Sequence, residues 1–293
     1  MVGDVLGRPG RKVLKAVLHQ FKQGLWPDLI VMNAENVAGG FGITCKIHDE
    51  MLEAGIDVMT MGNHWNDKPD IHKLRKTSRA LVLPQNLQNI EGVSQIPEFP
   101  IRRTSRTARV LNLMGQFAMK ETYGNPFHFV NQHCEMLSME RANGKSLCLV
   151  DFHAEASSEK QAVAWKLDGI CAALVGTHTH TPTADERVTS NGSAFLTDVG
   201  MTGPYESVIG MDIKRTLKRY FEPGAEKRAH EVASGDLWFC GFLVEVSPLT
   251  GLALRAHRLQ FRQQSNCWSF FTAGSMDSNF SRRVQRPSEE KNA

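Results

Sequence analysis

Short apolar runs alternate along this chain with segments of helical periodicity, and this alternation restricts the fold more than any other feature of the sequence. Residues 29–33, 57–61 and 170–175 are three such runs, each five or six residues long. Runs of this length that are apolar almost throughout predict strands buried on both faces. Strands separated by helices form a mostly parallel sheet that helices cover on both sides. The sequence therefore predicts an α/β protein.

The other expected elements follow the same pattern. Apolar side chains at helical spacing predict helices at 11–21, 44–54, 68–77 and 155–165. Further short apolar runs predict strands at 81–83, 109–114, 146–150 and 194–198. Two longer runs, 237–246 and 252–259, flank the turn sequence Ser-Pro-Leu-Thr-Gly and predict an antiparallel hairpin near the carboxyl end.

The composition excludes several classes of protein. Of the 293 residues, 41% are hydrophobic, which suffices for the core of one large domain. The net charge of +3 gives no whole-chain electrostatic case for binding nucleic acid or a membrane. No apolar stretch is long enough to cross a membrane and no basic-then-apolar leader is evident, so neither a transmembrane helix nor a signal peptide is expected. The six cysteines are scattered without a CxxC pair, which favours a reducing cytoplasm.

One domain is expected over residues 1–262, followed by a tail of different composition. Residues 263–293 are rich in Ser, Asn, Gln and charge, which predicts a poorly ordered segment. The pair Arg282 and Arg283 is weak evidence for a contact with RNA, because two charges contribute little binding energy. The sequence leaves open whether the tail docks on the body through its aromatic side chains, Trp268, Phe270 and Phe271.

Side chains of the types that bind metals follow the expected strands. The clearest are His178 and His180 in the sequence Gly-Thr-His-Thr-His, directly after the strand at 170–175. Taken singly, each such residue has an ordinary explanation as a helix cap, a turn residue or a hydrogen-bonded core side chain. In open α/β sheets, however, ligands bind at the carboxyl ends of strands. The other candidates there are Asp4, Glu35, Asn36, Asn63, His64 and His153.

Together these residues have the composition of a site for two metal ions. A dinuclear centre needs a bridging carboxylate, neutral imidazoles and harder oxygen ligands. Two metal ions about 3.5–4 Å apart clamp the attacking and leaving oxygens of an in-line phosphoryl displacement, and they acidify a bridging water. A histidine outside the metal ligands then protonates the leaving oxygen. Residues 39–42 are glycine-rich but lack a following Gly-Lys-Ser/Thr, so they predict a flexible loop beside the site rather than a phosphate cradle, and no cofactor-binding residue is assigned.

Six motifs, in order along the chain, resemble the YmdB-like bacterial metallophosphoesterases of the calcineurin-like superfamily. They are Gly-Asp-Val at 3–5, Asn-Ala-Glu-Asn at 33–36, Met-Gly-Asn-His at 61–64, Asp-Phe-His-Ala-Glu-Ala at 151–156, Gly-Thr-His-Thr-His at 176–180 and Thr-Asp-Val-Gly-Met-Thr-Gly-Pro-Tyr at 197–205. The resemblance covers roughly residues 1–262. It implies a four-layer α/β/β/α sandwich with two divalent metal ions, typically iron or manganese. It also implies phosphodiesterase activity, with 2′,3′-cyclic nucleotides as the expected substrate class.

The resemblance further implies a role for each matching residue. Glu35 would bridge the two metal ions, and Asn36 would lie beside them as a ligand or a contact to the phosphate. His64 would be the general acid. The remaining ligands would be divided between the metal ions, with Asp4 and His180 on the first and Asn63, His153 and His178 on the second.

Two positions depart from the family pattern. Only Met1 and Val2 precede Gly3 and Asp4, so either the start is truncated or the first strand is one or two residues long. A strand that short would hold Asp4 less firmly, because ladder bonds and buried side chains are lost. The aromatic Trp65 stands one position earlier than the family pattern has it, which would change what faces the substrate.

Three functions stay open at this stage. The favoured one is hydrolysis of small phosphodiesters such as 2′,3′-cyclic nucleotides, by attack of metal-activated hydroxide with His64 as the acid. The same centre would also serve a phosphomonoesterase or a nuclease. A site weakened by the short first strand would instead suit a nucleotide- or RNA-binding regulator without catalysis. The sequence predicts no membrane partner and leaves the oligomeric state open, a homo-oligomer included.

Overall fold

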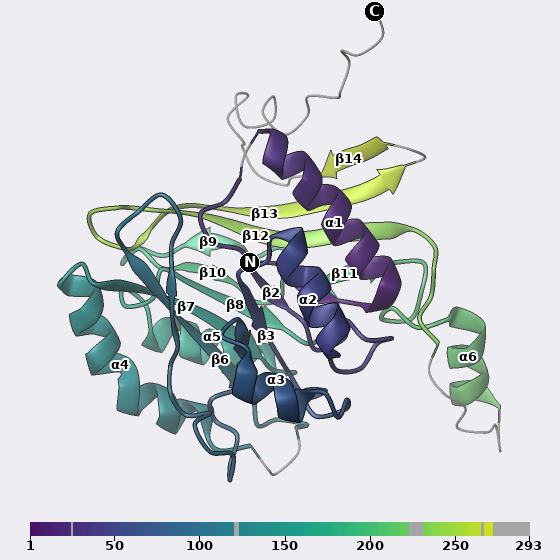
Figure 1. Ribbon diagram of the computed structural model, residues 1–293, viewed down its shortest axis with the longest axis horizontal. Helices are drawn as coiled ribbons and strands as arrows, with labels where there is room; N and C mark the ends of the chain where they lie inside the picture. Colours follow the sequence, from purple (N-terminus) through teal and green to yellow (C-terminus); the bar gives the residue numbers. More distant parts are fainter. Residues whose placement is uncertain (25, 120–122, 223–230, 265–266, 272–293) are drawn as a thin grey trace, which may run out of the picture.

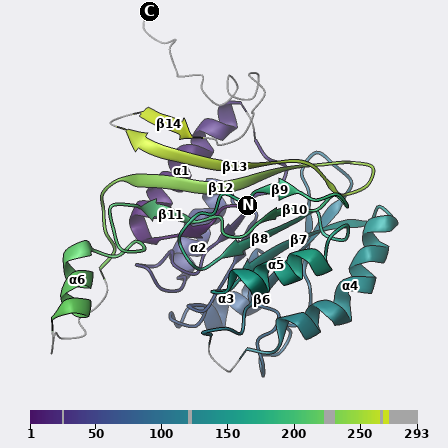
Figure 2. The same ribbon diagram turned by 180° about the vertical axis from the view of Figure 1, so that it is seen from behind.

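Two β-sheets pack face to face between two layers of helices (Figures 1 and 2). The computed structural model describes the chain apart from residues 25, 120–122, 223–230, 265–266 and 272–293. Three apolar clusters fill the spaces between the four layers, one on the outer side of each sheet and one between the sheets. The expected α/β/β/α sandwich is therefore confirmed.

The first sheet has a parallel part and a mostly antiparallel part, and the two meet at the start of the chain. Its parallel part is β2 (Val31–Asn33), β3 (Val58–Thr60) and β4 (Leu81–Val82). Val2 bridges Met32 of β2 on one side and Gly241 on the other, which joins the two parts. The second part runs in the order β1 (Asp4–Val5), β11 (Met201–Pro204), β12 (Leu237–Val246), β13 (Ala253–Gln264) and β14 (Cys267–Phe271). The expected carboxyl-terminal hairpin is β12–β13.

The second sheet has a parallel centre with an antiparallel strand at each edge. The spatial order of its strands is β5 (Glu98–Pro100), β6 (Thr107–Met114), β7 (Ser146–His153), β8 (Ala173–Thr177), β10 (Ala194–Leu196) and β9 (Arg187–Val188). Every residue of β7 is buried, as expected for a central strand that is covered on both faces. The carboxyl ends of β7 and β8 lie at one edge of this sheet, because these strands are parallel and in register.

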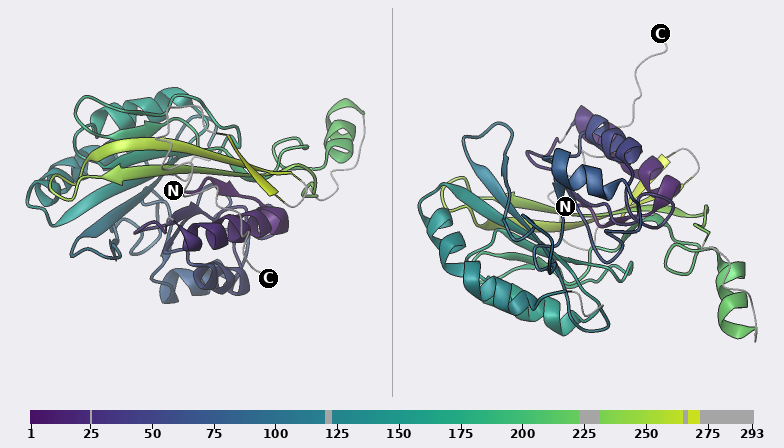
Figure 3. Two further views of the ribbon diagram at one scale, coloured as in Figure 1. Left: turned by 90° about the horizontal axis from the view of Figure 1, so that it is seen from above. Right: turned by 60° about the horizontal axis from the view of Figure 1, so that its bottom comes forward.

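Helices cover the outer face of each sheet (Figure 3). The first sheet packs against α1 (Gly7–Gln23), α2 (Cys45–Ala54) and α3 (Ile71–Thr77). The second sheet packs against α4 (Pro126–Ala142) and α5 (Ser157–Lys166). The remaining helix, α6 (Ile213–Phe221), projects from the body and has no buried residue. Among the helices in the described part of the chain, none is long and apolar enough to cross a membrane.

The structure differs from the sequence-based expectations in helix α4, in the short strands β5, β9 and β11 and near the carboxyl end, and it agrees with them at the first strand. Helix α4 was not expected, although Asn125 caps it by accepting a hydrogen bond from the His128 N–H and Pro126 stands in its first turn. The expected boundary at residue 262 falls inside β13, and β14 extends the sheet to Phe271; the tail from 272 to 293 lies outside the described residues. The first strand, β1, has the short length that the sequence allowed.

Candidate metal centre

The predicted ligand side chains come together where strands of both sheets end. Asp4 stands in β1, and His153 is the last residue of β7. Among the described residues, two groups of ligand-type atoms lie within 4.8 Å of one another, and Glu35 belongs to both. The first group is Glu35, His153 and His178, and the second is Asp4, Glu35 and His180. The asparagines join them through hydrogen bonds, because Asn63 contacts His153 and Asn36 contacts His180.

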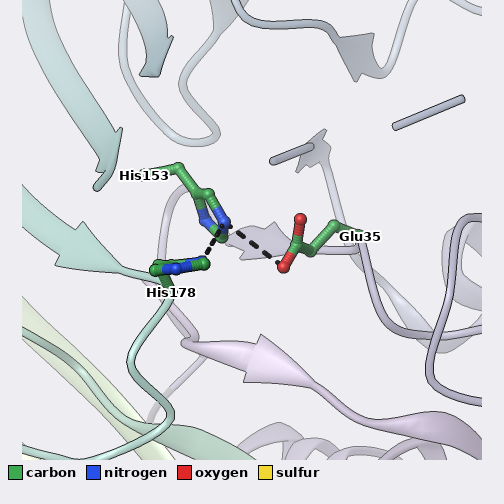
Figure 4. A group of neighbouring side chains, drawn as sticks. All are labelled: Glu35, His153 and His178. Atoms are coloured by element: carbon green, nitrogen blue, oxygen red, sulfur yellow. Dashed lines mark hydrogen bonds and ion pairs between the residues drawn. The ribbon is translucent and has the colours of Figure 1, made fainter. Parts of the chain in front are cut away.

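The first group surrounds the Nε2 atom of His153. Figure 4 shows the rings of His153 and His178 and the carboxylate of Glu35 pointing toward one another. The His153 Nε2 lies 3.0 Å from the His178 Nδ1 and 3.3 Å from a carboxylate oxygen of Glu35. It also lies 2.9 Å from the Asn63 Oδ1. Four potential ligand atoms from four strand ends therefore meet at one point.

The hydrogen bonds on the far side of each ring indicate that these nitrogens present lone pairs to that point. The Thr177 hydroxyl donates to Asp151 at 2.7 Å, so it accepts from the Nδ1–H of His153 at 2.9 Å, and the Nε2 of that ring is left as an acceptor. In His178 the Nε2 lies 3.1 Å from Glu155, which leaves its Nδ1 as an acceptor. Acceptors that face one another repel unless a cation lies between them. The donor set therefore fits a divalent metal ion.

The second group has a buried carboxylate oxygen that accepts no hydrogen bond from the described residues. The Asp4 Oδ2 accepts a hydrogen bond from the His178 backbone N–H at 3.1 Å, whereas its buried Oδ1 has no hydrogen-bond partner among the described residues. The Nδ1–H of His180 donates to the Ile209 carbonyl at 2.9 Å, so its Nε2 faces the site, 3.3 Å from the Asn36 Oδ1. A buried carboxylate oxygen without a partner is costly. A metal ion coordinated by Asp4 and His180 would remove that cost.

Burial sets the electrostatics of the metal-free site. Burial raises the pKa of Asp4 to about 7, and the nearby histidines offset only part of that effect. Burial acts against ionisation of Glu35 too, but the charge of His153 and its hydrogen bond lower the pKa of Glu35 to about 2. Conversely, burial disfavours the charged form of His153, yet Glu35 raises its pKa to about 9. A proton on His153 thus occupies the place that a cation would take.

His64 lies beside this centre but outside both ligand groups. Its backbone N–H donates to the Glu35 Oε2 at 3.1 Å, which fixes the start of the loop after β3. Its ring Nδ1 lies 2.7 Å from the Asp67 carboxylate, and the ring of Phe41 packs edge-on at 4.8 Å. The side chain is 28% exposed, so a substrate that enters from solvent reaches it.

The glycine at 62 lets the loop after β3 approach the ligands closely. A Cβ atom at Gly62 would lie 2.3 Å from the Glu35 Oε2 and 2.4 Å from the His153 Nε2, both far inside van der Waals contact. Any side chain at this position would therefore displace a ligand. Sterics therefore explain the glycine in the Met-Gly-Asn-His motif, because only a residue without a side chain lets Asn63 and His64 approach the other site residues.

A buried ion pair supports the turn that carries two of the histidines. His178 and His180 both have positive φ angles, 104° and 62°, which residues other than glycine adopt with strain. Between them, Thr179 donates to the Asp198 carboxylate through its N–H at 3.2 Å and its hydroxyl at 2.8 Å. The same carboxylate pairs with the ammonium of Lys160 at 2.8 Å, and both side chains are 1% exposed. The ion pair therefore stabilises the strained turn at residues 178–180.

Several supporting residues were missed at the sequence level. Asp151 and Asp198 fall within the quoted motifs, where only the neighbouring residues were assigned a role. Asp67 follows the Met-Gly-Asn-His motif but is not part of it. Lys160 is fully buried although it lies in a helix whose sequence gives no sign of an inward lysine. These residues contact the candidate ligands or the turn that carries them, but they are not themselves part of a metal-binding pattern. The sequence therefore gives no signal for their role.

The chain also matches known proteins in sequence. The model of a family described as YmdB-like protein matches residues 1–259. A Bacillus subtilis protein named 2′,3′-cyclic-nucleotide 2′-phosphodiesterase is 36% identical over 258 residues, which cover 88% of this chain and 94% of the relative.

Two solved structures share the fold. The structure of a Mycoplasma pneumoniae protein described as a novel phosphatase has a TM-score of 0.77 and 33% identity, and the match covers 89% of this chain and 92% of that one. A hypothetical protein from Thermus thermophilus has a TM-score of 0.79 and 28% identity, with coverage of 90% and 98%. The likeness thus extends over nearly the whole of each chain.

Proposed function

Because this chain belongs to the YmdB-like family within the metallophosphoesterase superfamily, we propose that it hydrolyses small phosphodiesters, 2′,3′-cyclic nucleotides above all, at a centre of two divalent metal ions. That the chain is a phosphoesterase follows from its relatives, which are named phosphodiesterase or phosphatase. The dinuclear centre is inferred from one observation, that two groups of ligand-type side chains share the carboxylate of Glu35. Iron and manganese suit this mixture of imidazole, carboxylate and amide ligands.

In this proposal each metal ion has its own ligands beside the shared Glu35. The pairing of Asp4 with His180 supports one metal position, and the convergence on His153 supports the other. Asn36 donates to the Gly40 carbonyl at 2.9 Å, which turns its Oδ1 toward the first position. The proposed ligands are Asp4, Glu35, Asn36 and His180 for the first metal ion, and Glu35, Asn63, His153 and His178 for the second.

The protein itself is proposed to contribute a general acid, His64, that is held in position beside the metal ions. When bound, two divalent metal ions would acidify a water and neutralise charge on the phosphate. His64 is proposed to give a proton to the ribose oxygen that leaves phosphorus. Asp67 holds the Nδ1 side of the ring, so that the Nε2 side is directed to the substrate. The activity is assigned to a catalytic body in the cytoplasm that takes in residues 1–262 together with the rest of β13 and β14, and a small phosphodiester is the proposed partner.

Hydrolysis of 2′,3′-cyclic AMP by purified protein, reconstituted with Mn²⁺ or Fe²⁺ and analysed for metal content, tests the proposal. We expect about two metal ions per chain and turnover that chelation abolishes and metal restores. One metal ion per chain with full turnover would rule out the dinuclear centre. Absence of both metal and turnover would favour the non-catalytic nucleotide- or RNA-binding alternative.

The description of the Mycoplasma pneumoniae protein as a phosphatase supports a second candidate, a phosphomonoesterase. A bis-aryl and a mono-aryl phosphate with the same leaving group separate the two candidates. Preference for the diester supports the first proposal, and preference for the monoester supports the second.

A further inference from the structure

A short glycine-rich loop connects Asn36, one of the proposed ligands, to the surroundings of His64. The Gly40 N–H donates to the Asn36 carbonyl at 3.1 Å, and the Ala38 N–H donates to the Gly42 carbonyl at 3.0 Å. Gly40 and Gly42 have positive φ angles of 96° and 68°, which glycine adopts without strain. Although the sequence predicts a flexible loop here, these bonds hold it in a compact turn beside the site.

The loop carries an aromatic side chain, Phe41, to the proposed general acid. The ring centroids of Phe41 and His64 lie 4.8 Å apart, and the two rings are inclined by 79°. The next residue, Gly42, fits closely against the loop after β3, because a Cβ atom there would lie 2.9 Å from the Lys68 Cγ and 3.4 Å from the His64 carbonyl oxygen. Phe41 and His64 are both partly exposed, so a substrate that binds at His64 can also contact the ring of Phe41.

The aromatic residue that follows His64 in the sequence does not take this position. Trp65 is partly buried and packs against the apolar cluster on the outer side of the first sheet. Its indole N–H donates a hydrogen bond to the Tyr123 hydroxyl. Trp65 thus contributes to the core, whereas Phe41 contacts His64 from a different loop.

The structure of the proposed substrate brings its base close to the ring of Phe41. In a 2′,3′-cyclic nucleotide the ribose oxygens bonded to phosphorus stand on C2′ and C3′, and the neighbouring C1′ carries the base. Because His64 is proposed to protonate the leaving ribose oxygen, the base would lie about one ring width from the His64 side chain. Nucleobases stack on aromatic side chains, and every base has a π face for that contact.

We propose that Phe41 forms a base subsite beside His64, in which the nucleobase of a 2′,3′-cyclic nucleotide stacks on the phenylalanine ring. The subsite rests on the proposed phosphodiesterase function and adds recognition of the base to it. Since stacking depends on the overlap of rings and needs no hydrogen bond, purines would bind better than pyrimidines.

The test compares 2′,3′-cyclic AMP with 1-O-methylribose 2,3-cyclic phosphate, which has the same reacting group and no base. The measured quantity is the ratio of the two kcat/KM values of the metal-reconstituted protein. Phe41→Leu keeps an apolar side chain against His64 but removes the aromatic face. We expect this variant to lower the ratio about 5- to 100-fold, whereas Phe41→Trp should keep the ratio or raise it.

A matched control removes a different exposed phenylalanine. Phe221 is 78% exposed at the end of α6, the helix that projects from the body (Figure 1). We expect Phe221→Ala to leave the ratio of the two kcat/KM values unchanged. A ratio that Phe41→Leu also leaves unchanged would overturn the base subsite, even if both kcat/KM values fall, because the loss would then come from a disturbance of His64.

Binding of adenosine 3′-phosphate and of ribose 3-phosphate, measured by calorimetry, tests the subsite without turnover. We expect the unmodified protein to bind the adenosine compound about 5- to 100-fold more tightly, and Phe41→Leu to remove most of that difference. Equal affinities in the unmodified protein would overturn the subsite. A difference that depends on Phe41 in a protein without turnover would support the subsite and refute the hydrolytic function.

Discussion

Glu35 is the residue on which the proposed chemistry most depends. Its carboxylate is 1% exposed and belongs to both groups of ligand atoms, so its charge would balance both metal ions. Carboxylates in a low-dielectric site are stable only when a cation accompanies them. In the metal-free protein that cation is the protonated His153, which a metal ion would replace.

Replacement of Glu35 tests the bridge directly. We expect Glu35→Ala to lose metal and with it all activity, because both metal positions lose a ligand and the charge that holds two cations together. Elemental analysis of the reconstituted variant measures the effect. A variant that still binds about two metal ions per chain would show that Glu35 does not bridge.

His64 should behave differently, because it lies outside both ligand groups. We expect His64→Gln to lower kcat by about 10² to 10⁴ while the metal content stays the same. Asp67→Asn is the companion variant: it keeps the acid but weakens its orientation, so a smaller loss of kcat is expected. Turnover of His64→Gln equal to that of the unmodified protein would exclude the role of general acid.

At the scale of elements, contacts with Asp198 and Lys160 hold the turn after β8 that carries His178 and His180. The φ angles of His178 and His180 are stabilised by the bonds from Thr179 to Asp198, and Asp198 is in turn neutralised by Lys160. The geometry of the ligands thus depends on a helix, α5, that contributes no ligand itself.

Lys160→Met should therefore affect both stability and metal binding. Removal of one partner of a buried ion pair leaves an uncompensated charge, and we expect a loss of about 3–5 kcal/mol in the free energy of unfolding. We also expect weaker metal binding, because the turn loses its anchor. Denaturant unfolding and metal titration measure the two effects. Glu140→Gln, which breaks the more exposed pair with Arg109 elsewhere on the second sheet, is the matched control and should leave metal binding unchanged.

The elements that the sequence predicted have a regular pattern of apolar residues, and helix α4, which it missed, does not. The central strands and α1 were predictable because one feature, a short apolar run or a helical stripe, matched their burial. Helix α4 was missed because its apolar residues are spread around its circumference, and only Asn125 and Pro126 mark its start. The clustering of the candidate ligands was predictable from residue type and position at strand ends. Their supports, such as Lys160, were not, because a buried lysine makes sense only with its partner in view.

On the scale of the whole molecule, the proposed centre connects the two sheets. Glu35 and Asn63 follow strands of the first sheet, and His153 and His178 belong to strand ends of the second. Metal binding would thus add contacts across the interface between the sheets. A ligand that binds only the folded state raises its stability according to its concentration and affinity.

Chelation should consequently lower the melting temperature. With metal at 100 times its dissociation constant, the stabilisation is about 2.7 kcal/mol, which corresponds to roughly 5–10 °C for a protein of this size. Differential scanning calorimetry with EDTA, and then with added Mn²⁺, measures the loss and its recovery. Glu35→Ala should show no such difference, whereas His64→Gln should retain it.

The interleaving of early and late parts of the chain has a consequence for its synthesis. Val2 lies between β2, which leaves the ribosome soon afterwards, and Gly241 of β12, which is made 239 residues later. Asp4 likewise accepts a hydrogen bond from the backbone N–H of His178, which is made 174 residues later. The nascent chain can form the second sheet while translation proceeds, since that sheet is complete by Leu196. The first sheet closes only after β12 has been made, so the residues of β1 stay exposed to chaperones and proteases until then.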